Sequence, residues 1–447
     1  MKKEIYPKKK FGGEITVPGD KSIAHRAALF SLLAQDKIII KNFPDNKDCQ
    51  TSLKAIETLG VTIEESEDKI ILTPPDKLNV DDETIIDCGN SGTTARLLAG
   101  IIAGSNAKVI LAGDESLSRR PMKRIIDPLT AMGADIYAED NHLPLKIAGK
   151  KLLPFEYRMP IASAQVKSAL LLAGLASSTS VTIQEEIITR DHTERMINEI
   201  GNGITVNEIK PLPIVDDIDP RKKKMKMPAD FKKEIKLSAP AKIIGGEIDI
   251  PGDISTAAFF MAIAAISKQK VTIENVGLNP TRTAFINYLK AIGCTVEIDN
   301  KRTISGEPRG IVSVTGGKLK SKKIVKDTTV ALIDEIPVIA VMGAFAEGTT
   351  IIRDAGELRV KESDRLTAIT ENLELMGVKC GLLEDGLVIE GGKDLNGADF
   401  KSYGDHRIAM AFSVAALFLV GPSTIDDISV VDISCPNFYN LVDKITK

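Results

Sequence analysis

The chain contains one segment twice, and this duplication constrains its fold more than any other feature. Residues 18–30 read PGDKSIAHRAALF and residues 251–262 read PGDISTAAFFMA, each shortly after a GGEI tetrapeptide. The turn residues and the serine recur, but the basic-type residues of the first copy are apolar in the second, at the pairs Lys21 and Ile254, His25 and Ala258, and Arg26 and Phe259. One local structure therefore accommodates either set, and the fold does not require these charges.

A longer periodicity surrounds the duplication. Six times, an apolar helix of small residues ends at a polar or glycine turn and passes into a strand of alternating hydrophobicity. The turns fall at Gln35, Gly104, Ser177, Lys268, Glu347 and Gly421, at intervals of roughly seventy to ninety residues. Amphipathic helices that close on glycine, such as AIETLGVTI, lie between most of these turns. The pattern predicts six α/β units in which helices alternate with strands.

The six units divide naturally into two groups of three, and 447 residues are too many for one ordinary core. Because a GGEI strand precedes both PGD segments, we expect the N-terminal strand to pair within the C-terminal half. We predict one lobe from residues 1–17 and 250–447 and a second from residues 18–249, with two hinge strands and a cleft between them. A Pro- and Lys-rich insertion within residues 206–244 breaks the pattern where a crossover is expected.

The composition excludes several classes of protein. With a net charge of −3, 43% hydrophobic and 27% charged residues, the chain has the composition of a globular protein without a general attraction for nucleic acid or anionic lipid. The N-terminus lacks the apolar core of a secretory signal, and the longest uncharged stretch, 408–425, has an apolar part too short to span a bilayer. The five cysteines form no CxxC pair, which argues against zinc sites and disulfides. We expect a cytosolic protein that binds neither nucleic acid nor membrane.

Polar and basic residues gather where several units begin their helices. Lys21 and Ser22 open one predicted helix, where free N–H groups and the helix dipole favour an anion. The segment 87–100, DCGNSGTTARLLAG, opens another with a turn whose amides around Asn90 to Thr93 can approach an anion, although the same residues also suit an ordinary turn. The sequence contains no GxxxxGK[ST] motif, so it is not a P-loop protein.

Further polar residues occupy the same position in other units. They are Arg119 and Arg120 before Pro121, Ser163 and Gln165, and Thr189 and Arg190. Pro121 is expected at the first position of a helix. Taken singly, each of these residues is ordinary surface material. Their shared position places polar side chains at the same end of several units.

In the C-terminal half, charged residues interrupt otherwise apolar helices. Asp334 precedes one such helix, and capping of that helix would explain it without a function. Lys361 and Arg365 are spaced one helical turn apart, as on a solvated face with salt bridges. Arg407 enters a helix of buried type, where an unpaired guanidinium is costly, so we expect it to face an anion or a carboxylate.

These segments carry a resemblance to a known family. From residue 12 to the C-terminus the sequence resembles the 5-enolpyruvylshikimate-3-phosphate synthases, a group of enolpyruvyl transferases. The matching segments, in order, are PGDKSIAHR, GNSGTTAR, RRPM, SAQVKSALLLAG, DHTERM, GLNPTRT, DEIPV, ELRVKESDRL and GDHRIAMAF. The resemblance implies a two-lobed fold in which each lobe contains three βαβαββ-type units with buried central helices.

The same resemblance implies a reaction and a site. The enolpyruvyl group of phosphoenolpyruvate would pass to the 5-hydroxyl of shikimate 3-phosphate, without metal or organic cofactor. Separately, we expect a monomer. The shikimate 3-phosphate site would contain Lys21, Ser22, Arg26, Ser163, Ala164, Gln165, Thr189, Asp334 and Lys361. The phosphoenolpyruvate site would contain Lys21, Asn90, Gly92, Arg120, Gln165, Arg365 and Arg407. We assign catalysis to Asp334 as base and Glu362 as acid, with Lys21, because the addition needs one proton removed and one delivered.

Some positions depart from the family's best-known pattern. They are Thr189 and Ala164, where serines occur, Glu357, where an asparagine can contact the phosphate, and Ile433, where a lysine is sometimes found. One alternative is the related transferase that acts on UDP-N-acetylglucosamine, but the chain lacks a Gly-Ala-Lys-Asn type element and a reactive loop cysteine. A non-catalytic anion-binding protein of the same fold is the other alternative, and the presence of both Asp334 and Glu362 argues against it.

Overall fold

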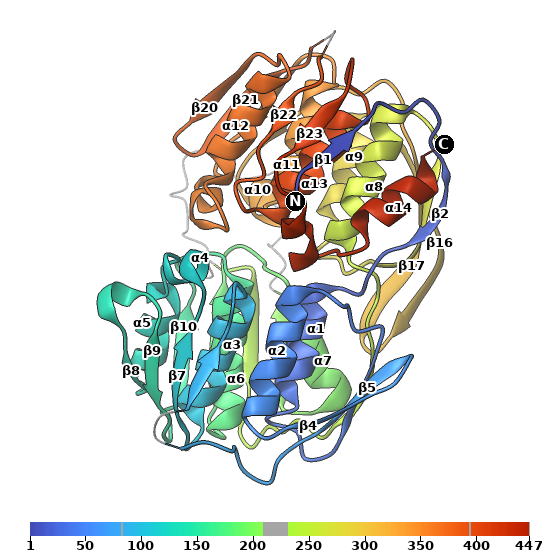
Figure 1. Ribbon diagram of the computed structural model, residues 1–447. Helices are drawn as coiled ribbons and strands as arrows, with labels where there is room; N and C mark the ends of the chain where they lie inside the picture. Colours follow the sequence, from blue (N-terminus) through green and yellow to red (C-terminus); the bar gives the residue numbers. More distant parts are fainter. Residues whose placement is uncertain (82–83, 209–230, 393–394, 447) are drawn as a thin grey trace, which may run out of the picture.

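The computed structural model describes residues 1–81, 84–208, 231–392 and 395–446, and Figure 1 shows them arranged as two lobes. The described residues contain two hydrophobic cores. One core takes its side chains from residues 23–250, whereas the other combines residues 5–17 with residues 254–445. We propose residues 18–249 and residues 1–17 with 250–447 as the two domains, called below the N-lobe and the C-lobe.

The strands of the described ranges form six sheets, three in each lobe. The N-lobe contains β3 (Ile38–Lys41), β4 (Thr62–Glu65), β5 (Lys69–Thr73), β6 (Ile85–Asp87), β7 (Lys108–Ala112), β8 (Asp135–Tyr137), β9 (Leu145–Ala148), β10 (Phe155–Arg158), β11 (Val181–Glu185), β12 (Ile204–Glu208), β13 (Lys233–Leu237) and β14 (Gly246–Asp249). The C-lobe contains β1 (Lys3–Ile5), β2 (Gly13–Thr16), β15 (Val271–Gly277), β16 (Thr295–Ile304), β17 (Glu307–Thr315), β18 (Lys323–Ile324), β19 (Thr349–Ile352), β20 (Cys380–Leu383), β21 (Gly386–Glu390), β22 (Asp399–Phe400) and β23 (Ser423–Ile425).

The second, third and fifth units follow the predicted βαβαββ order along the chain. The first and fourth units take their outer strands, β14 and β2, from the other end of a hinge crossing, and the sixth has a three-stranded sheet to which the N-terminal β1 contributes. In the third unit, for example, β10 pairs in parallel with β11, and β13 pairs antiparallel with both β11 and β12. The first helices of the six units are α1 (Lys21–Phe30), α3 (Gly92–Gly104), α6 (Ala164–Ala176), α8 (Ile254–Ser267), α11 (Ile336–Ala344) and α13 (His406–Ala416). The second helices are α2 (Lys47–Thr58), α5 (Lys123–Ala131), α7 (His192–Ile200), α9 (Ala284–Ile292), α12 (Arg365–Leu375) and α14 (Phe438–Ile445).

The first helix of each unit is the buried one. α11 and α13 are buried along their whole length, and α8 is buried over all but its last two residues. Alanine and glycine allow these helices to approach closely, while the second helices carry an apolar stripe and face water on the other side. Short elements complete the fold: α4 (Glu115–Ser118), α10 (Asp327–Ala331), η1 (Glu139–Asn141), η2 (Gly356–Val360) and η3 (Ser429–Ile433).

The chain crosses between the lobes twice, and the crossings exchange strands. β2 pairs in parallel with β15 in the C-lobe, which confirms that the N-terminal strand joins the C-terminal half, and β14 pairs with β3 in the N-lobe. The two crossings bond to each other, since the Asp20 N–H donates to the Pro251 carbonyl and the Asp253 N–H to the Pro18 carbonyl, both at 2.8 Å. Gly19 is required here because a Cβ would lie 2.1 Å from the Asn42 carbonyl oxygen.

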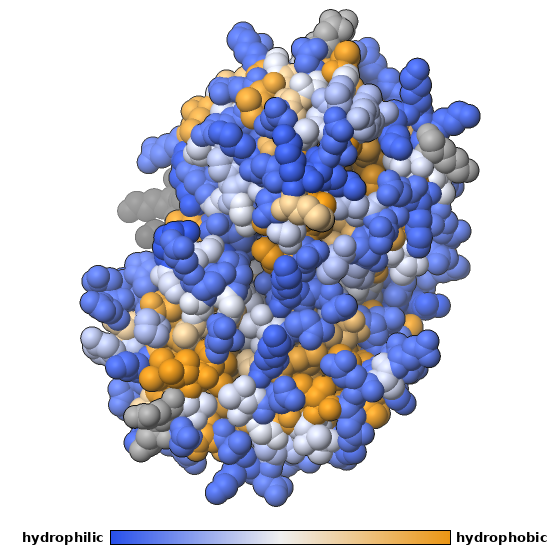
Figure 2. All heavy atoms as spheres, in the orientation of Figure 1, coloured by the Kyte–Doolittle hydropathy of each residue, from blue (hydrophilic) through white to orange (hydrophobic). Residues whose placement is uncertain are grey.

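The insertion does not lie at a crossover as expected, although the crossing itself lies at the lobe boundary near residue 250 that the sequence predicted. The Pro- and Lys-rich insertion connects β12 and β13, which pair antiparallel within the third unit, and the crossing comes later, after β14. Residues 209–230 of the insertion lie outside the described residues. Among the described residues, no helix is both long and apolar enough for a bilayer. On the face drawn in Figure 2 hydrophilic side chains predominate, and apolar ones gather mainly over the N-lobe.

Candidate active site

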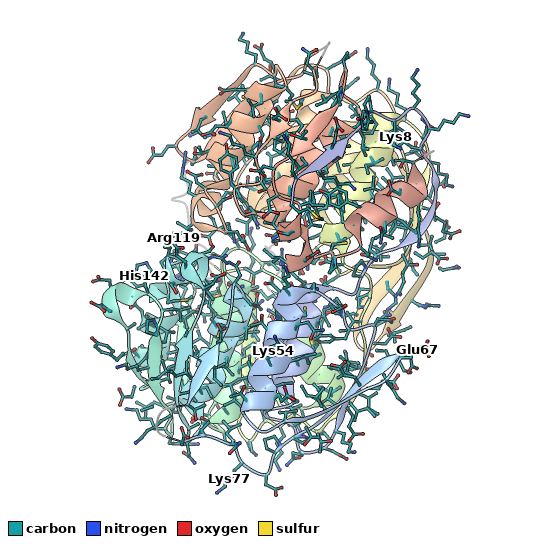
Figure 3. All side chains as sticks on the ribbon, in the orientation of Figure 1. Lys8, Lys54, Glu67, Lys77, Arg119 and His142 are labelled. Atoms are coloured by element: carbon teal, nitrogen blue, oxygen red, sulfur yellow. The ribbon has the colours of Figure 1, made fainter. Side chains whose placement is uncertain are left out.

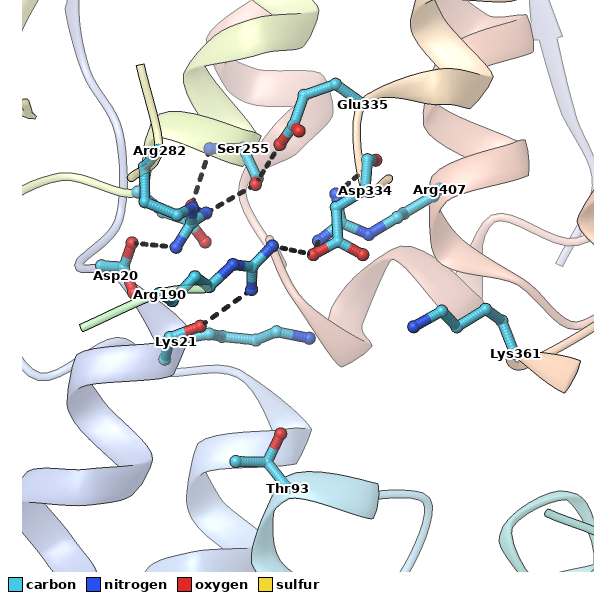
Figure 4. Close-up of polar contacts among 12 residues, drawn as sticks. Asp20, Lys21, Thr93, Arg190, Ser255, Arg282, Asp334, Glu335, Lys361 and Arg407 are labelled. Carbon is cyan, nitrogen blue, oxygen red and sulfur yellow. Dashed lines mark hydrogen bonds and ion pairs between the residues drawn. The ribbon is translucent and has the colours of Figure 1, made fainter. Parts of the chain in front are cut away.

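The starts of the buried helices are built by short polar caps. The capping side chains are those of Asp20, Ser91, Ser163, Asp253 and Asp405, each accepting a backbone N–H two or three residues further on. The capped helix starts lie at the junction of the lobes, where side chains of the two lobes meet. Arg190 of the N-lobe bonds to Ser22 at the start of α1 and to Asp334 of the C-lobe. Figure 4 shows the contact between Arg190 and Asp334.

Asp334 lies at the centre of a group of arginines. Its carboxylate pairs with Arg190 and lies 3.8 Å from the guanidinium nitrogens of both Arg365 and Arg407. Arg407 also donates to the Asp334 carbonyl at 2.9 Å. Its contact with the Asp334 carboxylate confirms the expectation that Arg407 faces an anion or a carboxylate. Burial opposes the charge of Asp334, but Arg407 and Arg190 hold its pKa well below the usual range. The capping interpretation is wrong, because α11 begins without a side-chain cap among the described residues.

Glu362 is the second half-buried carboxylate of the junction. Its Oε2 lies 2.7 Å from the Arg365 guanidinium, and its Oε1 lies 3.7 Å from that of Arg120 in the N-lobe. Arg365 is 1% exposed and also bonds Asp405 at 2.7 Å, so it belongs to no solvated face. Burial opposes the charge of Glu362, yet Arg365 and Arg120 keep its pKa well below the usual range. Lys361 follows η2 and α12 begins only at Arg365, so the two do not share a helix as the spacing suggested.

The two lysines of the site have carboxylate partners. Lys21 Nζ lies 2.6 Å from Asp48 Oδ2 in the first turn of α2, and although burial opposes its charge, Asp48 raises its pKa. Lys361 Nζ lies 3.8 Å from Glu357, and burial lowers its pKa. Glu357 turns toward Arg124 of the N-lobe, with 2.7 Å between oxygen and nitrogen. Each lysine therefore already has an anionic neighbour in the place where a substrate anion is expected.

The predicted phosphoenolpyruvate residues of the N-lobe form one group beside the start of α3. Arg120 donates to Asn90 Oδ1 at 2.7 Å, and Gln165 accepts from Arg96 at 2.9 Å. A Cβ on Gly92 would lie 2.7 Å from the Arg96 guanidinium. Burial, followed by the charges of neighbouring arginines, lowers the pKa of Arg96 to about 9.

The side chains of Arg119 and Arg120 lie in different surroundings. Arg119 lies at the margin between the lobes in Figure 3 and is paired with Glu115, whereas Arg120 is turned inward and 7% exposed. The helix expected to begin at Pro121 begins at Lys123 instead. The start of α5 is set by Met122 rather than by the proline.

Four predicted shikimate 3-phosphate residues are engaged within the N-lobe. Arg26 is 2% exposed and donates to Thr193, Ser168 and the Ser22 carbonyl. Thr189 donates its hydroxyl to Glu185, Ser163 caps α6, and Ala164 is its half-buried first residue. In this state the polar groups of Arg26 and Thr189 bond with the protein itself.

Sequence reasoning assigned no site role to four charged residues of the junction, although it noted the position of Arg190. They are Asp48, Arg96, Arg124 and Arg190, which pair with Lys21, Gln165, Glu357 and Asp334 respectively. Arg96 follows Gly92 by one helical turn, a spacing that could have indicated a shared face. The partners of the other three lie at least 27 residues away, beyond any local pattern. Within the described ranges no three His, Cys, Asp or Glu residues are placed to hold a metal ion.

Two lobes of three repeated units meet at arginines, lysines and carboxylates, an arrangement suited to an enzyme that binds anionic substrates. The comparisons with known proteins give the particular family. A model of EPSP synthase (3-phosphoshikimate 1-carboxyvinyltransferase) matches residues 5–441. The chain belongs to this family, which confirms both the resemblance and the fold class expected from the sequence.

Individual relatives cover the whole chain. The 3-phosphoshikimate 1-carboxyvinyltransferase of Thermodesulfovibrio yellowstonii is 44% identical over 455 residues, which is 100% of both chains. That of Anaeromyxobacter sp. (strain K) is 42% identical and covers 97% of this chain and 94% of its own. The structure of EPSP synthase from Acinetobacter baumannii superposes with a TM-score of 0.82 at 37% identity, covering 100% of this chain and 98% of that one.

Proposed function

We propose that this chain transfers the enolpyruvyl group of phosphoenolpyruvate to the 5-hydroxyl of shikimate 3-phosphate, with release of phosphate, as its family membership implies. One observation carries the assignment of the site. Buried cations of both lobes meet around Asp334 and Glu362, although the chain as a whole has a net charge of −3. Two multiply charged anions need such a local concentration of arginine and lysine.

We assign each substrate to its own group of residues at the junction, and each group contains residues of both lobes. Lys21, Ser22 and Lys361 bind shikimate 3-phosphate, and Arg190 joins them because it already bonds Ser22 and Asp334. Arg120, Arg365 and Arg407 bind phosphoenolpyruvate, with Asn90, Gly92 and Gln165 holding the nearby turn. The arginines offer paired donors to carboxylate and phosphate, whereas the lysines act as point charges.

Asp334 is the base of the addition step. Because its pKa lies well below the usual range, it is ionised at neutral pH and can accept the proton of the 5-hydroxyl as the oxygen attacks the central carbon of the enol. Arg190 and Arg407 hold the carboxylate in place. Neighbouring arginines stabilise the charged tetrahedral adduct.

Glu362 delivers a proton to the methylene carbon and takes one back when phosphate leaves and the double bond forms again. In the state described here Arg365 and Arg120 keep it ionised, so it cannot act as an acid. Phosphoenolpyruvate would compete for the same two guanidinium groups and remove that stabilisation. We propose that substrate binding thereby raises the pKa of Glu362, so that this residue takes up the proton that it later delivers.

The alternative that acts on UDP-N-acetylglucosamine is not favoured. That reading needs a reactive loop cysteine, and among the described residues Cys49, Cys88, Cys294 and Cys435 are buried. Burial raises the pKa of Cys88 to about 12 and that of half-buried Cys380 to about 11, so neither is a reactive thiolate. The family match supports the shikimate 3-phosphate reaction instead.

Phosphate release tests the proposal. The protein is incubated with phosphoenolpyruvate and shikimate 3-phosphate together, with each alone, and with phosphoenolpyruvate plus UDP-N-acetylglucosamine. Release only in the first mixture is expected. Release only with the nucleotide sugar would contradict the assignment, and binding without release in any mixture would favour a non-catalytic protein. Cytosolic location and a monomeric state stay predictions.

A further inference from the structure

Arg282 belongs to the segment GLNPTRT, which the proposed reaction leaves without a role. It is 6% exposed and lies in the loop between β15 and α9. Its guanidinium contacts Asp20 Oδ2 at 3.2 Å, Ser255 Oγ at 2.7 Å, Asp253 Oδ1 at 3.6 Å and His192 Nε2 at 3.5 Å. Figure 4 shows it between the chain segments of the two lobes.

These contacts join the starts of three helices. Asp20 caps α1 in the N-lobe, Asp253 caps α8 in the C-lobe, and His192 is the first residue of α7. Asp20 and Asp253 are the aspartates of the duplicated PGD segments, so one arginine serves both copies. Arg282 and, after it, His192 lower the pKa of Asp20 against the effect of burial, while burial and the charge of Asp20 raise that of Asp253.

The contacts of Arg282 continue to the proposed catalytic groups on both sides. On the N-lobe side, Asp20 directly precedes Lys21 and Ser22. On the C-lobe side, Ser255 donates to Glu335, which is 5% exposed and directly follows Asp334. One buried chain of polar contacts, Asp20–Arg282–Ser255–Glu335, therefore connects the segment of Lys21 with the segment of Asp334.

We propose that Arg282 is a positioning residue that fixes Lys21 and Asp334 relative to each other across the hinge. The inference rests on the proposed function, because it assigns Arg282 to the geometry of that reaction. Arg282 itself touches no proposed substrate position and acts through Asp20, Ser255 and Glu335. A displacement of about 1 Å between reacting groups lowers rates on the order of 100-fold, so loss of the connection should reduce turnover sharply.

Arg309 offers a matched control. It is 1% exposed and pairs with Asp249 at 2.8 Å beside the other crossing, where it also bonds Asn275 and the Ile304 carbonyl. Arg282→Met leaves the buried Asp20 and Asp253 without their shared cation, and Arg309→Met leaves the half-buried Asp249 without its cation at the hinge. Both variants should lose thermal stability. Only Arg282→Met should lose kcat, by roughly 100-fold, while Arg309→Met stays within about threefold of the wild type.

A double variant separates positioning from stability. In Arg282→Met, Asp20 and Asp253 repel each other without their shared cation. Arg282→Met/Asp253→Asn removes that repulsion, and the asparagine oxygen still accepts the Ser255 N–H that caps α8. We expect Tm to recover while kcat stays low. Recovery of kcat together with Tm, or an equal loss of kcat in Arg309→Met, would overturn the proposal.

The wild-type measurement keeps the two hypotheses apart. Absence of phosphate release by the wild type with both substrates would refute the proposed function. Turnover by the wild type together with unchanged kcat in Arg282→Met would refute only the role of Arg282. If Arg282→Met fails to fold, the double variant carries the same comparison of kcat with Tm.

Discussion

Lys21 and Ile254 are equivalent residues of the two copies, one at the start of α1 and the other at the start of α8. The structure supplies what the comparison of copies lacked, which is the partner of Lys21. Asp48 lies 2.6 Å away in the first turn of α2, and the two side chains are 15% and 12% exposed. The lysine charge is therefore balanced inside the N-lobe before any substrate binds.

Lys21→Ile should abolish turnover with little effect on stability. The apolar side chain suits the same position in the second copy, and the pair with Asp48 contributes about 1 kcal/mol, as partly buried ion pairs do. We expect kcat to fall by at least about 100-fold and Tm by no more than a few degrees. Phosphate release and calorimetry measure the two quantities, with Asp48→Asn as control for the unpaired aspartate. A large fall in Tm in Lys21→Ile alone would show that the lysine serves the fold.

The loss of thermal stability at acidic pH should depend on Asp334. Its folded-state pKa lies well below the usual 3.8, so only the unfolded chain takes up a proton there as the pH falls below about 4. The stabilisation is present above that range and is lost as the pH falls toward the folded-state pKa. Asp334→Asn should therefore flatten the dependence of Tm on pH between about 3 and 6, while lowering Tm at neutral pH because three arginines lose their carboxylate. Parallel Tm curves for variant and wild type would contradict this linkage.

At the residue scale, the sequence could predict the kind of partner that a buried charged residue needs, but not the direction in which its side chain points. The sequence placed Arg407 against a carboxylate because a buried helix cannot leave a guanidinium unpaired. It could not show that the Arg26 guanidinium donates hydrogen bonds to Thr193, Ser168 and Ser22, because these partners belong to three separate elements. Local capping rules offered a structural alternative for Asp334 that the structure contradicts, because the partners of this carboxylate lie in distant parts of the chain.

The buried helices α3 and α6 illustrate how small residues decide the packing of elements. A Cβ on Gly100 of α3 would lie 2.1 Å from the Ala169 carbonyl oxygen of α6, a backbone atom that cannot turn aside. Both helices begin at proposed substrate residues, Gly92 and Ser163 with Gln165. Their spacing therefore affects both stability and the geometry of the site.

Gly100→Ala should destabilise the N-lobe. The methyl group forces the helices apart, and overpacking of this kind costs about 1–3 kcal/mol or more. Unfolding in denaturant measures the loss, and the KM for phosphoenolpyruvate should rise with it because Gly92 is carried on α3. Gly381→Ala in β20 is the control, since nothing lies within 4 Å of its Cβ position. Equal stability of Gly100→Ala and wild type would contradict close helix packing.

At the element scale, the hydrophobic periodicity predicted those helices and strands that local sequence determines. The small apolar runs became the six buried helices, and the strand after each turn followed because the period changes from helical to alternating. Boundaries set by tertiary contacts were missed. Pro121 does not start α5, and the insertion after residue 208 connects a hairpin rather than a crossing, because strand exchange occurs where β14 pairs with β3.

Across the whole molecule, ion pairs between the lobes engage two of the cations proposed for the substrates. They are Arg190 with Asp334 and Arg120 with Glu362, and Glu357 pairs in the same way with Arg124 beside Lys361. Each of these three carboxylates would compete with a substrate anion. Binding therefore exchanges internal anions for external ones, and the lobe junction and the affinity for substrates are set by the same charges.

Glu357→Gln tests this competition. Glu357 lies 2.7 Å from Arg124 and 3.8 Å from Lys361, so its charge repels the phosphate that we assign to Lys361, while its bond to Arg124 holds the lobes together. Glu357 is 36% exposed, so water screens the pair and the bond contributes little. Removal of the repulsion, worth about 0.7 kcal/mol at a separation of roughly 6 Å in water, should dominate and lower the KM for shikimate 3-phosphate about threefold.

The KM for phosphoenolpyruvate should stay within about twofold, because Arg120 and Arg365 keep their charges. The gain in the Gln variant should shrink as salt rises from about 0.1 M to 1 M, since the Debye length falls from about 10 Å to about 3 Å. Glu115→Gln, which removes a comparable arginine partner within one lobe, should leave both KM values unchanged. A higher KM for shikimate 3-phosphate in Glu357→Gln would mean that the bond between the lobes outweighs the repulsion, so that this carboxylate favours substrate binding by holding the lobes together.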